Sequence, residues 1–535
     1  MTWSPSFIDR LRFADSLTFL FRLHFIQTAH GVGSELYLDN SNPEIQIESS
    51  SVRINGTSIT GQSFSSTFGS FSLRVVGDYR SISDSINRGQ IAILYVGFSD
   101  ISLSSYQRLI WGQLSNVRKI NFETYEFVFD DALSSLNNRQ DLRYDIVTTL
   151  HKSSLFYTLG QGTTLTGNFN TNSDTNLPVT DVTKFERDST GRGLMYINDT
   201  AHGTPFYAEW VSKTVTSSPA GYLVMRFTPT QKAYPTESAA TIPTTLHSAT
   251  TTVYNAGQIT DFPPHIMGKV IQTGTGAILD DLPDSWGVGG DFPSDIYDYA
   301  DSEIQKVYIR ASTAAAAVTY RWRIPLTGAV TEFMRVLTQK ANDLGQWPVL
   351  RQGRISWRGC DDPNETTIPN GLKPIAYNIT DDDIISVSRH EFFDAHVRGL
   401  YGKIAIKYDE NASIRTTTSS KKFSSLPAYT TADSRGDGLT YDNALDRRYL
   451  AEGDALRMQS YHRSITEKIT LTTQLHMCRF VAGDNVTISS SILFGRDEAK
   501  GATYDQRAGM ISGVDIDFGS RSCSVTILLL PKRSR

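Results

Sequence analysis

The stretches AGDNVTI at 482–488 and RGQIAI at 88–93 decide the fold, because a similar series of segments surrounds both. In each stretch a glycine turn leads into an apolar strand. A segment of alternating polarity precedes each, at 466–473 and at 70–76, and such a period of two is typical of a strand with one buried face. The two ends of the chain therefore show the same order of segments.

The spacing after the two glycine turns is also similar. Leu114 follows Gly89 by 25 residues, and Ile511 follows Gly483 by 28. A long strand, a hairpin and a last apolar strand complete each series. We predict one small β-barrel that is used twice in the chain. Any two antiparallel meanders share alternation and turn glycines, so the geometry must decide between duplication and coincidence.

Length and composition indicate a multidomain protein with ordinary cores. The chain has 535 residues, of which 39% are hydrophobic and 20% charged, and its net charge is −5. This charge predicts no general attraction to nucleic acid. The most apolar early stretch, 17–26, is interrupted by Arg22 and is too short to span a membrane, and no secretory signal is expected. Cys360, Cys478 and Cys523 imply no disulfide framework and favour a reducing cytoplasm.

Strand patterns dominate, so the predicted fold class is mainly β with some helices (α+β), with two similar small β-barrels near the chain ends flanking middle α+β domains. The predicted domains are a first tube-like β-barrel domain at 1–150, a β-rich insertion domain at 151–260, an α+β middle domain at 261–375 and a second tube-like β-barrel domain at 376–535. Helices are expected at 263–274, 327–344 and 442–462, a hairpin at 347–357 and long polar loops at 160–182 and 411–440.

The best metal-site candidate is HEFFDAH at 390–396. A zinc-protease helix needs two histidines four residues apart. Here position 394 is Asp, and six residues turn a helix by about 600°, so the two histidines would point apart. Asp381, Asp382 and Asp383 lack the spacing of a calcium loop. We predict a polar segment in the first case and a solvated turn or helix start in the second.

Other motifs predict no chemistry. The glycines at 160–162 and 274–276 lack the phosphate-binding lysine, and no Gly-x-Ser-x-Gly elbow is present. The aromatic stretch 206–210, with Tyr222 and Phe227, could stack on sugars but equally fills a sandwich core, and we favour the core. We predict no catalytic, cofactor-binding or metal-binding residue, no cofactor and no enzymatic activity.

Several features together carry a family resemblance. They are the glycine-turn strand and hairpin at 88–129, the helix and hairpin at 327–357, NITDDDI at 378–384, LYGKIAIKY at 400–408 and the closing strands at 483–514. Their order resembles the tail hub proteins of long-tailed bacteriophages and gene transfer agents, which are related in fold to baseplate hub proteins. The resemblance covers most of the chain except roughly 150–260.

The resemblance implies a structural protein of the virion, a homotrimer at the distal end of the viral tail tube. Three chains with two barrels each would present six units to a hexameric tube and three-fold symmetry to the tip. Expected partners are its own copies, a distal tail ring or tube protein, the tape-measure protein and a tip or fibre protein. DNA is expected only in passage through the lumen during genome ejection, and no membrane insertion is expected. The expected location is the virion tail, after virus assembly in the host cytoplasm. A receptor- or glycan-binding tail-tip protein is the main alternative, and a cell-wall hydrolase is a further one.

Overall fold

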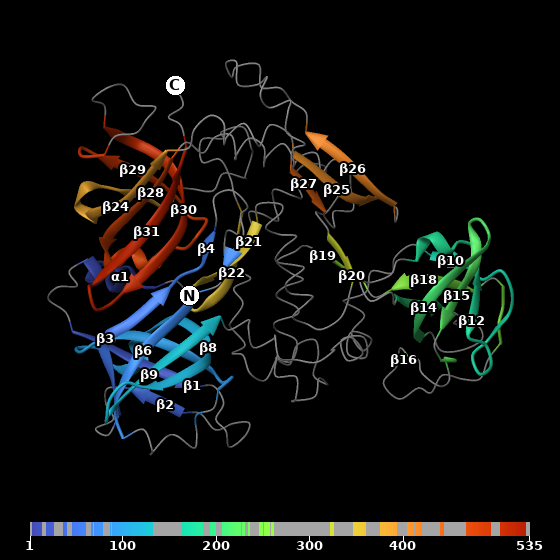
Figure 1. The fold of residues 1–535 in the computed structure, drawn as a ribbon, viewed down its shortest axis with the longest axis horizontal. Coiled ribbons are helices and arrows are strands. Elements are labelled where there is room, and N and C mark those ends of the chain that lie inside the picture. The colour runs from blue at the N-terminus through green and yellow to red at the C-terminus, as the bar shows by residue number, and fades with distance from the viewer. Residues whose placement is uncertain are drawn as a thin grey trace.

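The strands near the two chain ends form a single 13-stranded sheet (Figure 1). The computed structural model describes residues 3–12, 18–25, 36–39, 45–59, 66–67, 69–78, 86, 88–131, 162–185, 193–198, 206–225, 227–229, 234–235, 246–249, 251–256, 258–261, 322–325, 346–359, 375–392, 404–410, 413–419, 439–442, 467–493 and 503–530. The predicted helices at 263–274 and 327–344 lie outside the described residues, and so does the one at 442–462 except for Asp442, which ends a strand.

Six strands make up a first copy of the repeated unit. They are β1 (Phe19–Phe25), β3 (Ile45–Asn55), β6 (Ser70–Gly77), β7 (Ile91–Phe98), β8 (Gln107–Lys119) and β9 (Thr124–Asp131). Their order in the sheet is β1-β7-β8-β9-β6-β3, with β2 (Leu36–Asp39) outside β1.

Six strands near the C-terminus make up a second copy. They are β23 (Tyr377–Ile379), β24 (Ile384–Phe392), β28 (Glu467–Gln474), β29 (Asn485–Ser490), β30 (Tyr504–Asp517) and β31 (Ser522–Leu529). Their pairing order is β23-β29-β30-β31-β28-β24, which repeats the first copy strand for strand. The copies differ at this edge, where β1 is antiparallel to β7 but β23 is parallel to β29.

The registers of the two copies also agree. Leu114 pairs with Phe129 as Ile511 pairs with Ile527. A β-bulge follows at once in both, between Leu114 and Asn116 and between Ile511 and Gly513. The predicted repetition of segments is therefore confirmed at the level of strand pairing.

The two glycine turns have the same hydrogen bond. Gly89 N donates to Leu114 O at 2.8 Å, and Gly483 N donates to Ile511 O at 2.7 Å. Both glycines have positive φ angles, 93° and 102°, which residues other than glycine rarely adopt. The turn that the sequence singled out is thus the same local structure in both copies.

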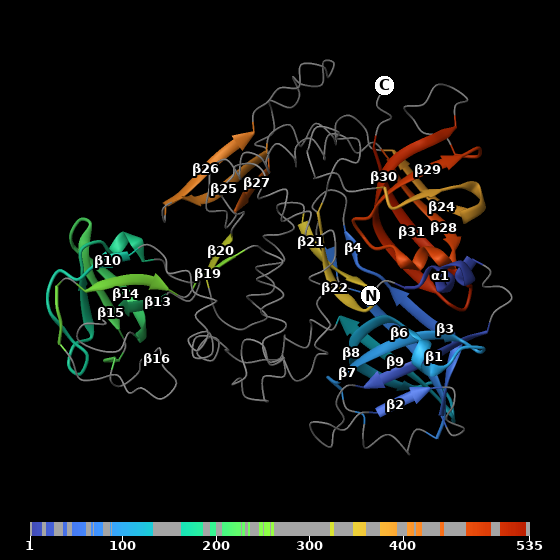
Figure 2. The same ribbon diagram turned by 180° about the vertical axis from the view of Figure 1, so that it is seen from behind.

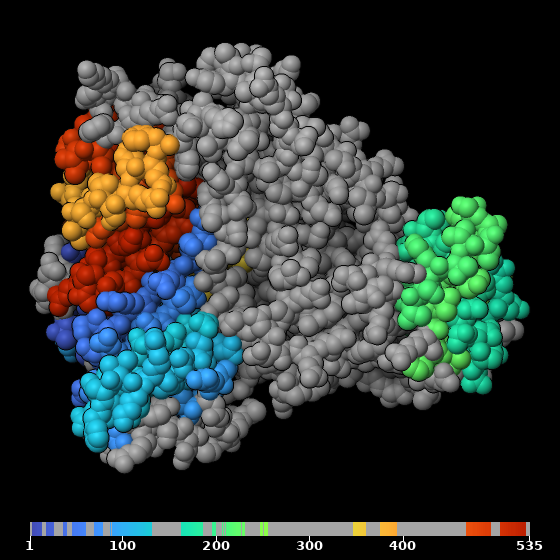
Figure 3. All heavy atoms as spheres, in the orientation of Figure 1, coloured from blue at the N-terminus to red at the C-terminus, as the bar shows by residue number. Residues whose placement is uncertain are grey.

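Among the described strands, by contrast, no closed barrel is observed. The described strands of both copies run on as one large, mostly antiparallel sheet, joined where β3 pairs with β30. Alternating side chains of both copies fill one hydrophobic core, to which Phe21, Phe129 and Ile527 contribute. The mainly β class is confirmed, while the barrel arrangement stays a prediction. In Figure 3 the two copies adjoin along one side of the molecule.

A seven-stranded sheet forms a separate core at the opposite end of the molecule (Figure 2). It contains β10 (Gly162–Thr164), β12 (Asn176–Val179), β13 (Gly193–Asn198), β14 (Phe206–Ser217), β15 (Ala220–Met225), β16 (Tyr234–Pro235) and β18 (Thr252–Ala256). The predicted loop at 160–182 was wrong, because β10, β12 and β11 (Phe169–Asn170) lie there, with Phe169, Leu177 and Val179 buried.

The remaining elements are short. The strands are β4 (Ser58–Ile59), β5 (Ser66–Thr67), β17 (Leu246–His247), β19 (Gln258–Asp261), β20 (Trp322–Pro325), β21 (Gln346–Arg351), β22 (Arg354–Gly359), β25 (Ile404–Glu410), β26 (Ser413–Ser419) and β27 (Leu439–Asp442). Because β26 and β27 lie at 413–442, the predicted loop at 411–440 was also partly wrong. The hairpin β21–β22 is confirmed, with Gln352 and Gly353 at φ 51° and 67° in its turn.

Helical structure is sparse in the described residues. Helix α1 (Pro5–Arg12) begins after Ser4, whose Oγ accepts from Phe7 N at 3.2 Å, and it buries Phe7 and Leu11. The 3-10 helices are η2 (Leu103–Ser105), η4 (Val182–Lys184), η6 (Asp381–Asp383) and η9 (Leu475–Arg479). Within the described part of the chain, none of the helices has the length and apolar character to span a membrane.

Candidate functional site

The candidate site is the junction between β3 and β30, where one copy of the unit binds the other. Arg53 pairs with Asp517 in the strand register, and 3.5 Å separates Arg53 Nε from Asp517 Oδ2. Gly56 N donates to Val514 O at 3.0 Å. A Cβ atom on Gly56 would overlap that carbonyl oxygen, so this close approach requires glycine. Backbone pairing therefore holds the junction, and one ion pair accompanies it.

Phe518, in the hairpin that follows β30, anchors the junction in the first copy. Its ring centroid lies 5.3 Å from that of Phe19 and 4.9 Å from that of Phe21, both edge to face. Phe518 N donates to Val52 O at 3.1 Å, and the side chain is 4% exposed. Edge-to-face rings contribute about 0.5–1.5 kcal/mol beyond their burial. The hairpin tip of the second copy is thus part of the first copy's core.

The β21–β22 hairpin contacts both copies and fixes their relative position. Leu350 N donates to Thr57 Oγ1 of the first copy at 3.3 Å. Arg358 Nε donates to Asp484 Oδ1, in the glycine turn of the second copy, at 3.2 Å, and both side chains are buried. Removing one partner of such a buried pair would leave an uncompensated charge. The hairpin therefore links the two copies at the junction through these hydrogen bonds.

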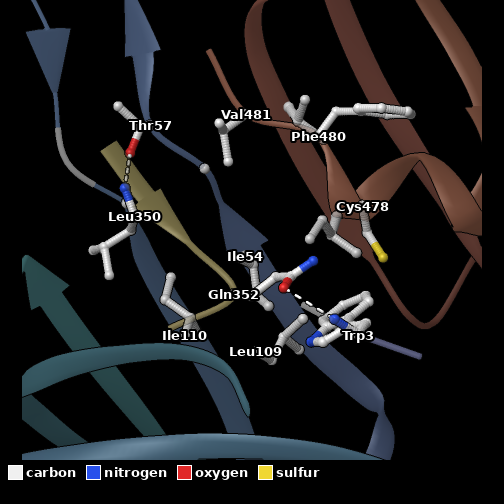
Figure 4. A pocket seen from close by; sticks show the side chains of 14 residues that line it. Trp3, Ile54, Thr57, Leu109, Ile110, Leu350, Gln352, Cys478, Phe480 and Val481 are labelled. Carbon is white, nitrogen blue, oxygen red and sulfur yellow. Dashed lines mark hydrogen bonds between the residues drawn. The ribbon is translucent and has the colours of Figure 1, made fainter. Parts of the chain in front are cut away.

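A small pocket lies where the two copies, the hairpin and the N-terminal residues meet (Figure 4). Trp3 N donates to Gln352 Oε1 at 3.2 Å across it. Ile54, Leu109 and Phe480 make much of the lining apolar. The cavity holds about 40 Å³, room for a few water molecules and far below the size of a cofactor site. This pocket belongs to the packing of the junction.

A buried carboxylate cluster surrounds Asp383 in the second copy. Tyr377 OH donates to Asp383 Oδ1 at 2.9 Å, and His476 Nε2 lies 3.1 Å from the same oxygen. Thr380 N donates to Oδ2 at 2.9 Å. Burial raises the pKa of Asp383, but the contacts with His476, Thr380 and Tyr377 outweigh it and lower the pKa to about 2. Asp383 is therefore a carboxylate that ties β23 and η6 to η9.

A second cluster surrounds Glu467 on β28. Tyr504 OH donates to Glu467 Oε2 at 2.6 Å, and His390 Nε2 lies 2.9 Å from it. Arg507 Nη2 donates to Oε1 at 3.2 Å. Burial raises the pKa of Glu467. The hydrogen bonds with His390 and Tyr504 and the charge of Arg507 lower the pKa by more than burial raises it, so the net shift is downward. This cluster links β24, β28 and β30.

The structure describes one predicted metal candidate in part and the other in full. His390 and Glu391 lie on β24, while His396 lies outside the described residues. The three aspartates form η6, as a turn was predicted, but Asp383 is buried and not solvated. Across the described ranges, no group of three or more His, Cys, Asp or Glu side chains could hold a metal ion.

The aromatic stretch at 206–210 belongs to a core. Phe206 and Trp210 are fully buried in the seven-stranded unit, which confirms the core interpretation for these two rings. Phe227 is 39% exposed. Of the two glycine motifs, Gly162 lies on β10, and the other glycines lie outside the described residues.

Sequence reasoning missed two exposed apolar surfaces. The β8–β9 hairpin tip carries Ile120 and Phe122, 49% and 88% exposed. On β24, Ile385, Val387 and Phe392 are also exposed. The sequence places a phenylalanine in each of the two hairpin tips, Phe122 and Phe518. Which of the two rings is exposed follows only from the fold.

No protein-family model and no curated protein matches the chain. Among solved structures it is similar to the 43 kDa tail protein of prophage MuSo2 from Shewanella oneidensis, with 11% identity, a TM-score of 0.37, and 96% of this chain and 98% of that chain covered. It is also similar to a tail protein from Neisseria meningitidis MC58, with 9% identity, a TM-score of 0.37 and 96% of each chain covered. A chain of a native gene transfer agent virion shows 10% identity and a TM-score of 0.31 over 71% of this chain and 88% of that chain. At TM-scores below 0.5, the likeness by itself assigns neither fold nor function.

Proposed function

We propose that the chain is a structural hub protein of a bacteriophage tail tip or baseplate. In this role it forms a trimeric ring with pseudo-six-fold symmetry and joins the hexameric tail tube to the three-fold tip. The observation that carries the proposal is the repetition of one six-strand order, with the same register and the same glycine turn, in the two copies.

Symmetry connects this repetition to the function. Head-to-tail contacts close into a ring when a whole number of the rotations between neighbouring units adds up to 360°. A chain that holds two similar units already makes one such contact internally, through β3 and β30. Three chains would supply six units, which match a six-fold tube on one side. The segments between the two copies occur once per chain and would give three-fold symmetry on the other side.

The proposed role is not enzymatic. The buried clusters around Asp383 and Glu467 hold elements together, and the pocket at the junction is too small for a substrate. We propose as partners further copies of the chain, a distal tail ring or tube protein, the tape-measure protein and a tip or fibre protein. DNA would pass through the lumen, and the protein would reside in the virion tail after assembly in the host cytoplasm. Burial of Phe206 and Trp210 weakens the alternative of a glycan-binding tail-tip protein.

Native mass spectrometry of the purified chain tests the oligomeric state. One chain has a mass of 59.4 kDa, and we expect a species of three times this mass. A protein that stays monomeric at every concentration, or that forms only dimers, would contradict the proposal. Incubation with peptidoglycan is expected to release no soluble fragments.

A further inference from the structure

β24 is an edge strand whose apolar side chains are exposed. Among the described strands it pairs with β28 alone. Ile385 is 58% exposed, Val387 41% and Phe392 47%. A sheet edge presents a row of backbone N–H and C=O groups and is a template for a further strand. Exposed apolar side chains beside such an edge mark an interaction surface.

The first copy shows what covers the equivalent edge. β3 corresponds to β24, because Ile54 pairs with Phe71 on β6 as His390 pairs with Ile469 on β28. The outer edge of β3 is covered by β30 of the second copy. Since β30 corresponds to β8, the strand that fits the outer edge of β24 is the β8 of a first copy.

The end of β8 is available for this contact. The hairpin tip after β30 buries Phe518 against the other copy, at 4% exposed. The hairpin tip after β8 leaves Phe122 88% exposed and Ile120 49% exposed. The outer edge of β24 and the end of β8 thus present complementary halves of a junction that β3 and β30 already make within the chain.

We infer that β8 of one chain pairs with the outer edge of β24 of a second copy of the chain. Three such junctions between chains would alternate with the three β3–β30 junctions inside chains. The inference rests on the proposed ring, which it completes by naming the strands that meet. The strand that occupies the β24 edge therefore belongs to a second copy of this chain.

The register of the internal junction fixes the register of the new one. Inside the chain Asn55 pairs with Asp515. The positions that correspond to these two residues are Glu391 on β24 and Arg118 on β8. Opposite charges therefore face each other across the proposed junction, an arrangement that stabilises a cross-strand pair.

Both charged groups lie on the surface of the single chain. Arg118 is 58% exposed and contacts Glu126 at 2.6 Å, and Glu391 is 31% exposed and contacts Arg389. The pairing ends at Glu391, because Phe392 stands where the internal junction has Gly56, whose missing Cβ makes room for a carbonyl. The new junction is therefore shorter than the internal one and relies more on the apolar tip.

Disulfide trapping tests the contact directly. In the full chain, Arg118→Cys and Glu391→Cys are combined, and the protein is treated with a mild oxidant and run without reductant. We expect covalent dimers and trimers at least tenfold more abundant than in the matched control Arg118→Cys with Glu48→Cys, a partly exposed position on β3. Cross-linking no greater than in this control, in a protein that is trimeric by native mass, overturns the inference and leaves the proposed ring intact. A protein that does not self-associate overturns both.

Discussion

Ser115 and Ser512 occupy the same bulge in the two copies, and each side chain donates to a carbonyl of the neighbouring strand. The distances are 3.1 Å from Ser115 Oγ to Val128 O and 3.2 Å from Ser512 Oγ to Thr526 O. The two acceptors correspond in register, since each precedes the residue that pairs with Leu114 or Ile511. Similarity between the copies therefore extends from strand order to a single side-chain contact.

The bulge serines should contribute similarly to stability. A hydrogen bond of this kind contributes about 1 kcal/mol, so Ser115→Ala and Ser512→Ala should each lower the free energy of unfolding by about that amount. Chemical denaturation measures the change. Ser104→Ala, on the exposed side of η2, is the control and should have almost no effect. A large loss at one bulge with none at the other would argue against equivalent copies.

Alanine substitution of the two hairpin phenylalanines, Phe518 and Phe122, should have opposite effects on the stability of the single chain and on self-association. Phe518→Ala removes a ring from the core and should cost about 3–5 kcal/mol of unfolding free energy. Phe122→Ala removes an exposed ring and should leave the stability of the single chain within about 0.5 kcal/mol, while it weakens self-association. Denaturation at low protein concentration and sedimentation at high concentration separate these effects. Unchanged self-association of Phe122→Ala would contradict a role for that tip in the contact between chains.

Gly56→Ala should open the junction inside the chain. The added Cβ would overlap Val514 O, so β3 and β30 would have to move apart, at a cost of more than about 2 kcal/mol. Hydrogen exchange of the Gly56 and Phe518 amides should accelerate, since both donate across the junction. The control is Gly167→Ala, where the nearest atom to a Cβ is Pro178 Cγ at 3.8 Å. Retained protection in Gly56→Ala would show that the junction does not depend on this approach.

Charge reversal should reveal the contact between chains. Arg118→Glu or Glu391→Arg alone should weaken trimer formation, by about three- to tenfold in each dissociation constant, and the double variant should recover most of it. Glu126→Gln removes the partner of Arg118 within the chain and is the matched control, with trimer formation expected to be unchanged. Sedimentation velocity measures all four proteins. Additive losses in the double variant would contradict the pairing.

Acid should destabilise the protein through Asp383. Its pKa is about 2 in the fold against 3.8 as the ordinary value, so its stabilising contribution is present above about pH 4 and is lost as the pH falls from 4 to 2. The shift corresponds to about 2 kcal/mol at neutral pH. Asp383→Asn should flatten this part of the stability curve, and Tyr377→Phe, which removes one donor, should move it to higher pH. A wild-type curve that is flat between pH 4 and 2 would contradict the assignment.

Local pattern was enough to predict the repeated part of the fold. Glycine turns at Gly89 and Gly483 and strands of period two are short-range signals, and the hairpin at Gln352 follows from its turn residues. The polar strands β10 to β12 were missed because few apolar residues mark them, and their partners lie far along the chain. The barrels were predicted from the repeat alone and stay a prediction, whereas the pairing of β3 with β30, which joins the two copies into one sheet, follows from no local pattern.

The candidate site was harder to predict because it depends on long-range contacts. Asp383 belongs to an acidic run that looks solvated, yet His476 packs against it and buries it. The exposure of Phe122 and the edge position of β24 depend on which strands pair with each other in the sheet. No local pattern contains that information.

Electron cryomicroscopy of the self-assembled protein tests the central claim most directly. We predict a ring of three chains in which six similar sheet units surround a central channel, with successive units related by rotations close to 60°, a sixth of a full turn. Residues of β8 in one chain should lie against β24 of the next. Particles without a ring, or a ring in which the first and second copies occupy different radii or heights, would contradict the claim that the two copies act as equivalent units.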